Sequence, residues 1–563
     1  MPPKTFLSTL AKKNLPNPLR CATLLAPQLT LLKSLSKNGA RPSGHSKPRL
    51  NALLPTPAMT VLKPSFEEFS TLTASGNMIP VWTELAADYE TPISAFQKLS
   101  EGHSEPCFLL ESAENSEQIG RFSFLGTDPR LEIRATGREI SVRNKGASNF
   151  ETHLLPESDG DPMHEVERLM AAFKPVEVRG LPVFTGGAVG FLGYDMVRFF
   201  ETTVPGPSDD GLGLPDMVFL ITDSLVIFDH RFRKLQVVAN ICTDDFDTIE
   251  AAYEAGRTRI ETIINRLSKP QSVAPFSLME EPEDTGVIDS NTTQEEYEGM
   301  VRKAKDYILA GDIFQVVPSQ RFETDYQGRP IDLYRALRHV NPSPYMFCLQ
   351  FGEEFSLVGS SPEVHVQTID GNIKIRPIAG TRWRGETEEE DQTLAEDLLA
   401  DPKERAEHVM LIDLARNDVG RVAEFESVKV DEMMIIERYS HVMHIVSNVV
   451  GKLNSDQTAY DVMRATFPAG TVSGSPKVRA MQIIDEMENS KRGPYSGAVG
   501  YFGFDGNHDS CIALRTVVLK NQKAYVQAGA GVVADSIPEN EFHETVNKAK
   551  GMMRAIERAK LLK

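Results

Sequence analysis

The chain has 563 residues, of which 41% are hydrophobic, 8% aromatic and 25% charged. This composition is typical of a globular protein with a large core and excludes a disordered or fibrous chain. The formal net charge of −19 argues against nucleic acid or an anionic membrane as the main partner. No apolar run reaches the length of a membrane span, and the five cysteines have neither disulfide-framework nor zinc-site spacing.

Basic residues concentrate at the N-terminus. Residues 1–63 contain ten Lys or Arg and no Asp or Glu, so the remaining 500 residues carry a formal charge of −29. Two interpretations stay open for this basic extension. Residues 1–58 have the composition of an organellar transit peptide, or the segment is untranslated or disordered sequence and Met59 is the true start. We expect a cytoplasmic protein, or an organellar matrix protein if the transit peptide is translated.

A first domain is expected over 78–269. Short alternating or β-branched runs predict strands of an antiparallel sheet at 107–112, 131–136, 218–230 and 234–241, with helices near 162–173 and 245–267. Residues 270–290 are polar, acidic and contain proline, which is typical of a linker.

A second domain is expected over 291–557. Thr293 and Glu296 form a capping box, and the helix that they begin ends at Gly311. A strand over 312–322, a helix beginning at Asp401-Pro402 and a last helix from about Pro538 follow. The whole pattern predicts an α+β fold.

Two nonapeptides echo each other, GAVGFLGYD at 187–195 and GAVGYFGFD at 497–505. Glycines at alternate strand positions mark a close approach of two backbones. We predict glycine-rich strands where the two halves face each other, with coincidence as the alternative.

Polar and glycine motifs fall where strands of the second domain should end or helices begin. They are GSSPE at 359–363, PIAGTR at 377–382, AEH at 406–408, VMHIVS at 442–447, FPAGTVSGSPK at 467–477, RGPYSGAVGYF at 492–502 and QAGAGVVADSIPENEF at 527–542. In this order they resemble the chorismate-utilising enzymes, and specifically the anthranilate synthase component I family, over roughly 80–557. The resemblance implies a chorismate-binding-enzyme fold in which two intimately packed units form a β-sandwich flanked by helices.

The activity implied by the resemblance is the Mg²⁺-dependent conversion of chorismate and ammonia to anthranilate and pyruvate. It proceeds through 2-amino-2-deoxyisochorismate, is the first step of tryptophan biosynthesis and is inhibited by tryptophan. The chain has no GxCxG nucleophile elbow, so a glutamine amidotransferase subunit, anthranilate synthase component II, is expected to supply the ammonia. Two alternatives stay open: an aminodeoxychorismate synthase component I, or a catalytically silent tryptophan-sensing subunit.

Four residues match catalytic positions of the family. Glu363 matches the general acid at the C4 hydroxyl, Thr471 lies along the ring, and His444 matches the histidine beside it, although a lone histidine between apolar residues is also typical of a core. Gln315 stands where isochorismate and salicylate synthases carry a water-activating lysine, which favours ammonia as nucleophile. Ala379 stands where aminodeoxychorismate synthases often carry a nucleophilic lysine.

Substrate and metal positions also follow from the resemblance. The substrate-binding residues are Gly380, Thr381, Tyr495, Arg515, Gly529, Ala530, Gly531 and Lys548. A guanidinium suits a carboxylate, and glycine segments let backbone N–H groups approach one. Glu407 and Glu541 match the Mg²⁺ ligands. Without the resemblance, Glu407 would be a first-turn acid that complements a helix dipole, and Glu541 would lie on a solvated helix face.

A regulatory tryptophan site is implied between the two halves. It comprises Glu111, Ser112, Asn341, Pro344, Tyr345, Met346, Val499, Tyr501 and Cys511. Without the resemblance, the PSPYM segment at 342–346 would be a plain proline-rich turn before a strand.

Overall fold

The computed structural model describes residues 61–102, 104–112, 120–206, 209–271, 277, 289–439 and 442–562. Residues 1–60 of the predicted basic extension and most of the predicted linker over 270–290 therefore lie outside the described residues. The last residue of the predicted extension is part of the fold, because Lys63 exchanges two backbone hydrogen bonds with Trp82.

One large antiparallel sheet takes strands from both halves of the chain. Its order is β1 (Met78–Ala86), β10 (Lys234–Cys242), β9 (Ser224–Asp229), β3 (Phe122–Thr127), β2 (Cys107–Glu111), β14 (Tyr345–Phe351), β15 (Phe355–Ser361), β24 (Thr516–Lys520), β25 (Lys523–Gly529), β13 (Ser319–Asp325) and β11 (Asp289–Ser290). The halves meet where β2 pairs with β14, with Glu111 opposite Met346.

A second large antiparallel sheet faces the first and is also shared. Its order is β18 (Ile378–Trp383), β20 (Val442–Lys452), β17 (Asn372–Ile375), β16 (Val364–Ile369), β23 (His508–Ile512), β22 (Ala498–Gly503), β7 (Gly187–Leu192), β8 (Met217–Thr222), β4 (Leu131–Thr136), β5 (Glu139–Asn144) and β6 (Glu151–Leu154). β19 (Lys429–Arg438) pairs with β20, and the short strands β12 (Gln315–Val316) and β21 (Gly474–Ser475) pair with each other.

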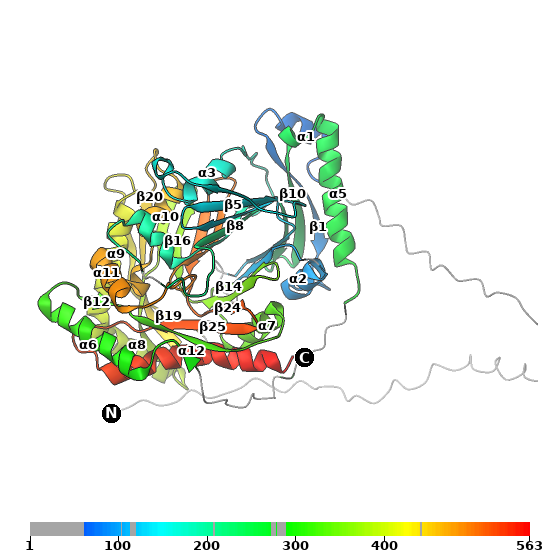
Figure 1. Cartoon of the computed structure of the whole chain (residues 1–563). Coiled ribbons are helices and arrows are strands. Elements are labelled where there is room, and N and C mark those ends of the chain that lie inside the picture. The colour runs from blue at the N-terminus through cyan, green and yellow to red at the C-terminus, as the bar shows by residue number, and fades with distance from the viewer. Residues whose placement is uncertain are drawn as a thin grey trace, which may run out of the picture. The chain divides into compact units, whose positions relative to one another are not determined.

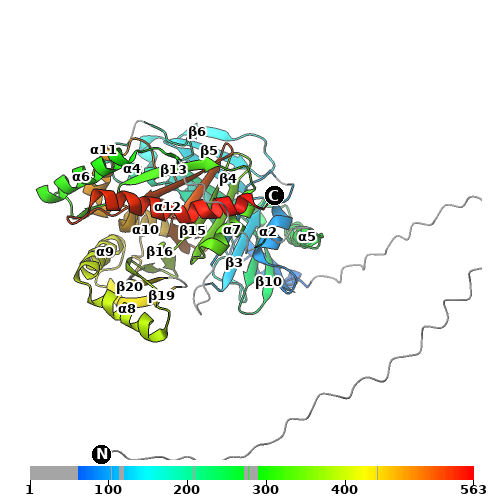
Figure 2. The same cartoon turned by 90° about the horizontal axis from the view of Figure 1, so that it is seen from below.

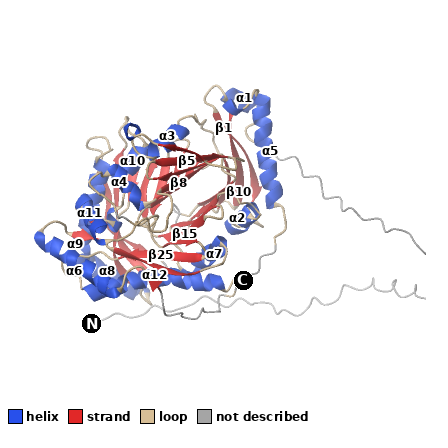
Figure 3. Cartoon of the chain, viewed as in Figure 1, coloured by secondary structure: helices blue, strands red, loops and turns tan. Residues whose placement is uncertain are grey.

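Helices cover the outer faces of the two sheets (Figures 1 and 3). They are α1 (Phe66–Leu72), α2 (Pro92–Ser100), α3 (Met163–Met170), α4 (Val197–Phe200), α5 (Ile249–Leu267), α6 (Gln294–Ala310), α7 (Pro330–Val340), α8 (Glu388–Ala400), α9 (Pro402–Gly420), α10 (Ala459–Thr466), α11 (Lys477–Met487) and α12 (Pro538–Lys560). Figure 2 shows α12 running across the molecule, and it packs against α6, α7 and β25. The layers are therefore a β-sandwich flanked by helices, as predicted.

Three apolar cores correspond to these layers. One joins α2, α5, α7 and α12 to the outer face of the first sheet, and another joins α3, α6, α10 and α11 to the outer face of the second. Between the sheets lie large side chains from both, including Phe108, Phe347, Phe191 and Tyr501. Burial of one such ring stabilises the fold by about 1.5–3 kcal/mol, so apolar burial holds the two sheets together.

The predicted elements are largely confirmed, with two differences. The run over 218–230 is two strands, β8 and β9, because the chain turns at Asp223 between them. The predicted strand over 312–322 divides into β12 and β13 on either side of a break at 317–318, and the two strands pair with different partners. The predicted capping box at Thr293 and Glu296 is present, and Gly311 ends α6 in a left-handed conformation.

The prediction about the two glycine-rich nonapeptides is confirmed, since β7 and β22 are antiparallel neighbours with Gly190 opposite Gly500. A Cβ atom on Gly500 would lie 2.1 Å from the carbonyl oxygen of Asp509, and one on Gly190 would lie 1.9 Å from that of Val218. Only glycine allows this spacing at the centre of the second sheet.

Within the described residues, the helices lack the combination of length and apolar character that crossing a membrane requires.

Candidate active site

A buried carboxyl group lies beside a threonine hydroxyl. Glu363, just beyond β15, is 5% exposed, and Thr471 donates a hydrogen bond from Oγ1 to its Oε1 over 2.7 Å. Burial raises the pKa of Glu363 to about 8, although the hydrogen bonds from Thr471 and from the backbone of Ile378 act in the opposite direction. Glu363 is therefore protonated at neutral pH, as a general acid must be.

The imidazole of His444 is oriented by β18, the neighbouring strand. Its Nδ1 lies 2.9 Å from the carbonyl oxygen of Gly380 and 3.1 Å from Oγ1 of Thr381. A carbonyl only accepts hydrogen bonds, so Nδ1 carries the proton and the Nε2 lone pair is left for another role. Burial lowers the pKa of His444, the Gly380 carbonyl opposes this effect, and the charge of Arg515 adds to it. The ring is accordingly neutral at pH 7.

The Gly529-Ala530-Gly531 segment begins at the last residue of β25 and contacts two other predicted site residues. A Cβ atom on Gly531 would lie 2.9 Å from Nε2 of Gln315, and one on Gly529 would lie 2.8 Å from the hydroxyl oxygen of Tyr495. Gly529 is required, because a Cβ there would also lie 2.8 Å from the backbone oxygen of Pro318, whereas a Cβ on Gly531 would displace only the end of the Gln315 side chain. The structure thus brings together Gln315, Tyr495 and the glycine segment.

Two contacts modify the expected anion cradle. The N–H of Ala530 donates to the carbonyl of Pro318 over 3.2 Å, so in this conformation it is not available to a substrate carboxylate. Lys548 on α12 donates from Nζ to the carbonyl of Gly529 over 3.0 Å and forms an ion pair with Glu544 over 2.8 Å. The lysine therefore places positive charge at the glycine segment, although it is not free of partners.

Arg515 occupies a tight connection between β23 and β24. Its φ of +45° is left-handed, which costs a non-glycine residue on the order of 1 kcal/mol or more. In the described part of the chain, its guanidinium makes one hydrogen bond, from Nη1 to Oδ1 of Asn341 over 3.2 Å. Since a guanidinium has five N–H donors, most of them remain for a carboxylate.

The two predicted metal ligands, Glu407 and Glu541, belong to α9 and α12, which lie far apart in the sequence. Asp401 caps α9 by accepting hydrogen bonds from the N–H groups of Lys403 and Glu404, and this cap places Glu407 in the second turn. Burial raises the pKa of Glu407, and the charge of Glu541 on α12 contributes in the same direction. Glu407 is thus not an isolated helix acid, because it lies within electrostatic reach of a second carboxylate.

The donor set fits a hard divalent cation. Burial raises the pKa of Glu541 as well, so a bound cation would stabilise the ionised form of either carboxyl group. Lys403 Nζ lies 3.9 Å from Glu407 Oε1 and opposes the rise in the pKa of Glu407 only in part. Among the residues that the structure describes, no group of three or more His, Cys, Asp or Glu side chains could hold a metal ion. A metal here would take its other ligands from water and from a substrate, as Mg²⁺ commonly does.

A cavity of about 600 Å³ lies between the two sheets. Eight of the nine predicted tryptophan-site residues line it: Glu111, Ser112, Pro344, Tyr345, Met346, Val499, Tyr501 and Cys511. Phe184 stacks on Tyr501 with ring centroids 4.0 Å apart, which gives the cavity an aromatic wall. Asn341, the ninth, is not among the lining residues and instead contacts Arg515.

Glu111 and Ser112 differ in what their side chains contact. Ser112 Oγ is buried and has no hydrogen-bond partner among the described residues, a condition that costs about 1–3 kcal/mol and that a polar ligand would relieve. The carboxylate of Glu111 accepts hydrogen bonds from Tyr334 and Arg338 of α7, over 2.7 and 2.8 Å. The Glu111 side chain therefore fixes β2 to α7.

Polar groups that sequence reasoning missed also line this cavity. Asp509 accepts hydrogen bonds from Tyr345 Oη over 2.9 Å and Gln367 Nε2 over 3.1 Å, and burial raises its pKa to about 6. Lys374 lines the same cavity and has no ion-pair partner within the described ranges. No motif marks these positions, which the pairing of β16, β17 and β23 brings together.

Some residues that line the cavity also contact His444, the predicted catalytic histidine. Arg376 forms an ion pair with Glu437, and Tyr439 donates a hydrogen bond from Oη to Glu437 over 2.8 Å. The ring of Tyr439 lies edge-on to the imidazole, with centroids 5.5 Å apart. The cavity and the candidate active site are therefore neighbours that share the side chains of β19 and the residue after it.

The family model of the chorismate binding enzymes matches residues 105–554, which is most of the chain. The chain belongs to the chorismate binding enzyme family. Every predicted site residue, from Glu111 to Lys548, falls within the stretch that matches this family.

Relatives within the chorismate binding enzyme family include anthranilate synthase component 1 of Aquifex aeolicus (strain VF5). It is 49% identical over 494 residues, which cover 88% of this chain and 97% of that protein. Anthranilate synthase component 1 of Acetivibrio thermocellus is 46% identical over 502 residues, covering 88% and 99%.

Two solved structures have a similar fold. The crystal structure of anthranilate synthase component I from Streptococcus pneumoniae TIGR4 matches with a TM-score of 0.68 and 39% identity, covering 83% of this chain and 98% of that one. The menaquinone-specific isochorismate synthase MenF from Escherichia coli matches with a TM-score of 0.62 at 17% identity, covering 87% and 98%. At that identity the second match bears on the fold alone.

Proposed function

We propose that the protein is an anthranilate synthase large subunit, which converts chorismate and ammonia to anthranilate and pyruvate. The observation that carries the proposal is Glu363, a buried carboxyl group that stays protonated at neutral pH beside the hydroxyl of Thr471. The relatives named anthranilate synthase component 1, at 46–49% identity over nearly their whole length, support the same reaction.

In the first half-reaction, ammonia forms a bond to C2 of chorismate, the ring double bonds shift, and the C4–O bond breaks. Glu363 gives its proton to the departing hydroxyl, which leaves as water, and ammonia loses a proton, so that 2-amino-2-deoxyisochorismate results. Gln315 supports ammonia as the nucleophile because an amide cannot act as the base that activates water. Arg515, most of whose N–H donors remain, is suited to orient a substrate carboxylate, and Lys548 adds positive charge at the glycine segment.

In the second half-reaction, the C2 proton and the C3 enolpyruvyl group are eliminated. His444 is neutral, and its Nε2 lone pair is available because Nδ1 donates to Gly380. We assign to Nε2 the removal of the C2 proton, which gives an aromatic ring and releases enolpyruvate, the precursor of pyruvate.

Glu407 and Glu541 are the residues that would hold Mg²⁺, which when bound supplies positive charge for a substrate carboxylate. Glu407→Gln is expected to weaken Mn²⁺ binding, measured by electron paramagnetic resonance, at least tenfold, and to lower turnover at limiting Mg²⁺. Glu557→Gln, on the distant end of α12, is the control. Equal Mn²⁺ affinity in the two variants would remove Glu407 from the metal site.

The cavity between the sheets is proposed as a feedback site for tryptophan. Phe184 and Tyr501 provide an aromatic wall for an indole, and Ser112 and Lys374 are suited to a carboxylate, because both lack a partner among the described residues. Asp509 offers a buried acceptor for an ammonium group.

A separate amidotransferase subunit, anthranilate synthase component II, is proposed as the source of ammonia in the cell, in line with the component naming of the relatives. We propose a cytoplasmic location, or an organellar matrix if residues 1–58 act as a transit peptide. N-terminal sequencing of the endogenous protein distinguishes these two locations.

The test of the activity is an assay with chorismate, Mg²⁺ and ammonium, followed by anthranilate fluorescence. We expect anthranilate and pyruvate in equal amounts, and inhibition by tryptophan. Release of aminodeoxychorismate would favour the para-aminobenzoate branch, which Ala379 in place of a lysine disfavours. Tryptophan binding without turnover would favour a silent sensing subunit.

A further inference from the structure

A buried ion pair lies behind the candidate active site. Arg492, the first residue of the RGPYSG motif, is 3% exposed, and Glu488, one turn earlier, is 8% exposed. Arg492 donates from Nε to Oε2 of Glu488 over 2.8 Å and from Nη2 to Oε1 over 2.6 Å. A buried pair of charges is tolerated only when its remaining donors and acceptors also form hydrogen bonds. The other hydrogen-bond partners of Arg492 and Glu488 therefore contribute to the stability of this pair.

The remaining donors of Arg492 bind three separate segments. Nη2 donates to the carbonyl of Val317 over 2.6 Å, and Nη1 donates to the carbonyl of Val472 over 2.9 Å and to Oγ of Ser496 over 3.3 Å. Together with the two hydrogen bonds to Glu488, these contacts use all five N–H groups of the guanidinium.

Each of these three acceptors lies next to, or two positions from, a residue assigned to the candidate site. Val317 follows β12, and Val472 ends the 3-10 turn at Gly470–Val472. Ser496 ends the turn at 493–496 that precedes β22, with a left-handed φ of 65°. The site residues beside them are Gln315, Thr471 and Tyr495.

Glu488 extends the same arrangement to the glycine segment. Its Oε1 accepts hydrogen bonds from the backbone N–H of Ser319 over 2.8 Å and from Oγ of Ser319 over 2.9 Å. Ser319 is the cross-strand partner of Gly529 in the pairing of β13 with β25.

Two aromatic rings lie against the guanidinium. Its central carbon is 4.7 Å from the ring centroid of Tyr194 and 5.6 Å from that of Tyr495. Tyr194 comes from the first half of the chain, and its N–H donates to the carbonyl of Gly493 over 2.8 Å. Arg492 thus contacts the segments of the site and also connects them to the facing half.

We propose that Arg492 is a positioning residue, which fixes Gln315, Thr471 and Tyr495 relative to one another without touching substrate. Its kinetic consequence rests on the function proposed above. Displacements near 1 Å at a reacting centre cost about 10²-fold in rate, so a residue that sets three such positions strongly affects turnover. Lysine cannot replace it, because a single ammonium group lacks the planar set of five donors.

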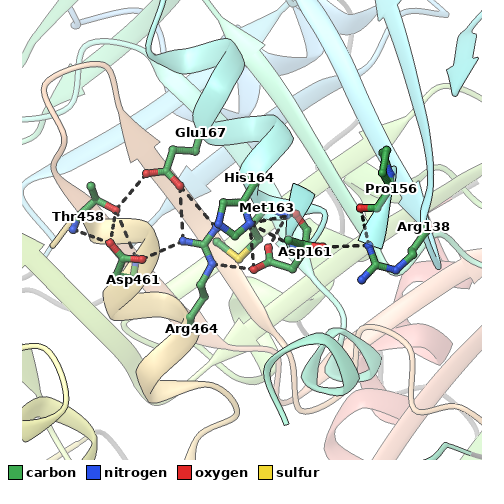
Figure 4. A network of polar contacts seen from close by, with 10 residues as sticks. Arg138, Pro156, Asp161, Met163, His164, Glu167, Thr458, Asp461 and Arg464 are labelled. Atoms are coloured by element: carbon green, nitrogen blue, oxygen red, sulfur yellow. Dashed lines mark hydrogen bonds and ion pairs between the residues drawn. The ribbon is translucent and has the colours of Figure 1, made fainter. Parts of the chain in front are cut away.

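The test compares Arg492→Lys with a matched control, Arg464→Lys. Arg464 is also a largely buried arginine that joins the two halves, with its side chain 16% exposed (Figure 4). It donates from Nε to Asp161 over 2.8 Å and from Nη1 to Asp461 over 3.0 Å, and it approaches Glu167 over 3.5 Å. None of these partners is a predicted site residue. The control variant Arg464→Lys therefore measures the effect of weakening a buried ion pair on stability alone.

We expect Arg492→Lys to lower kcat/KM for chorismate by about 10–100-fold, and Arg464→Lys to change it less than about threefold. The alkaline limb of the pH profile should move to higher pH in Arg492→Lys only, because a displaced Thr471 no longer stabilises ionised Glu363 by hydrogen bonding. Hydrogen–deuterium exchange should increase at 313–319, 470–475 and 493–497 in that variant.

Ser496→Ala is a milder second variant, which removes one acceptor and should give smaller effects in the same direction if Arg492→Lys does not fold. A folded Arg492→Lys with kinetics, pH profile and exchange like those of Arg464→Lys would overturn the inference. If the unmodified protein forms no anthranilate, the proposed function fails, whereas the exchange comparison still decides whether Arg492 holds the three segments.

Discussion

Arg515 and Asn341 are hydrogen-bonded to each other, with Nη1 of the guanidinium 3.2 Å from Oδ1 of the amide. Asn341 is itself fixed, because it caps the C-terminus of α7 and donates from Nδ2 to Oγ of Ser360 over 3.0 Å. A neutral partner orients the guanidinium without neutralising its charge, which leaves Arg515 ready to bind an anion. The resemblance implies that Asn341 belongs to the tryptophan site, whereas its hydrogen bond connects it to Arg515, a predicted substrate-binding residue.

Asn341→Ala is therefore expected to raise the KM for chorismate about 3–10-fold, which corresponds to the loss of one hydrogen bond of about 0.5–1.5 kcal/mol. The change should fall on KM more than on kcat, because a carboxylate contact is made in the ground state and the transition state alike. Steady-state kinetics at saturating ammonium measure it, with Asn372→Ala on the exposed end of β17 as control. An unchanged KM with altered tryptophan inhibition would return Asn341 to the regulatory site.

Local sequence patterns were sufficient to predict several of the helices and strands that hold the site residues. The capping box at Thr293 and Glu296, the Asp401-Pro402 helix start and the glycine nonapeptides are short-range patterns, and each of these elements forms where the pattern indicates. Family motifs were sufficient to name side chains that the structure brings together, such as Glu363 with Thr471 and Gln315 with Gly531.

Other features depend on pairing between distant strands and have no local signal. Lys374 and Asp509 meet at the cavity only because β17 and β23 both pair with β16. In the sequence, Arg492 is only one more residue of a glycine-rich motif. Its role is visible only in the structure, because its hydrogen-bond partners lie on four different segments. The turn at Asp223 was missed because both flanking runs are apolar and β-branched.

Because β7 and β22 approach each other closely, a larger residue in β22 should lower the stability of the protein. Gly500→Ala should lower the free energy of unfolding by on the order of 3 kcal/mol, because the new methyl group meets the backbone oxygen of Asp509 and the sheet must separate. Gly299→Ala is the control, since a Cβ there on α6 has nothing within 4 Å and should stabilise the protein by about 0.5–1 kcal/mol. Urea unfolding followed by circular dichroism measures both. Equal stability of the two variants would contradict the close packing.

The regulatory proposal predicts the effect of removing the unpartnered hydroxyl of Ser112. Ser112→Ala should raise the tryptophan concentration for half-inhibition about 3–10-fold, because the ligand loses one hydrogen bond. Thermal stability without tryptophan should not fall, since the hydroxyl has no partner among the described residues to lose. Ser123→Ala on β3 is the control, because its hydroxyl contacts His230 instead of the cavity. Identical inhibition curves for the two variants would argue against the cavity as the tryptophan site.

Glu363 gives the protein a specific dependence of stability on pH. Its pKa is about 8 in the folded state because of burial, against about 4.3 for an exposed glutamate in the unfolded chain. Between these values the folded state holds one more proton than the unfolded state, so this group makes the free energy of unfolding fall as pH rises.

Glu363→Gln should remove that slope, because the amide does not ionise and can still accept the hydrogen bond from Thr471. The variant is expected to match the stability of the unmodified protein near pH 4.5 and to be more stable by roughly 2–5 kcal/mol near pH 9. Its turnover should fall about 10²–10⁴-fold, because the amide cannot donate a proton to the departing hydroxyl. Urea titrations at several pH values measure the first effect and anthranilate formation measures the second. Glu298→Gln on the surface of α6 is the control and should leave the slope unchanged. If Glu363→Gln and the unmodified protein lose stability in parallel as the pH rises, Glu363 is ionised in the folded state and cannot be the general acid.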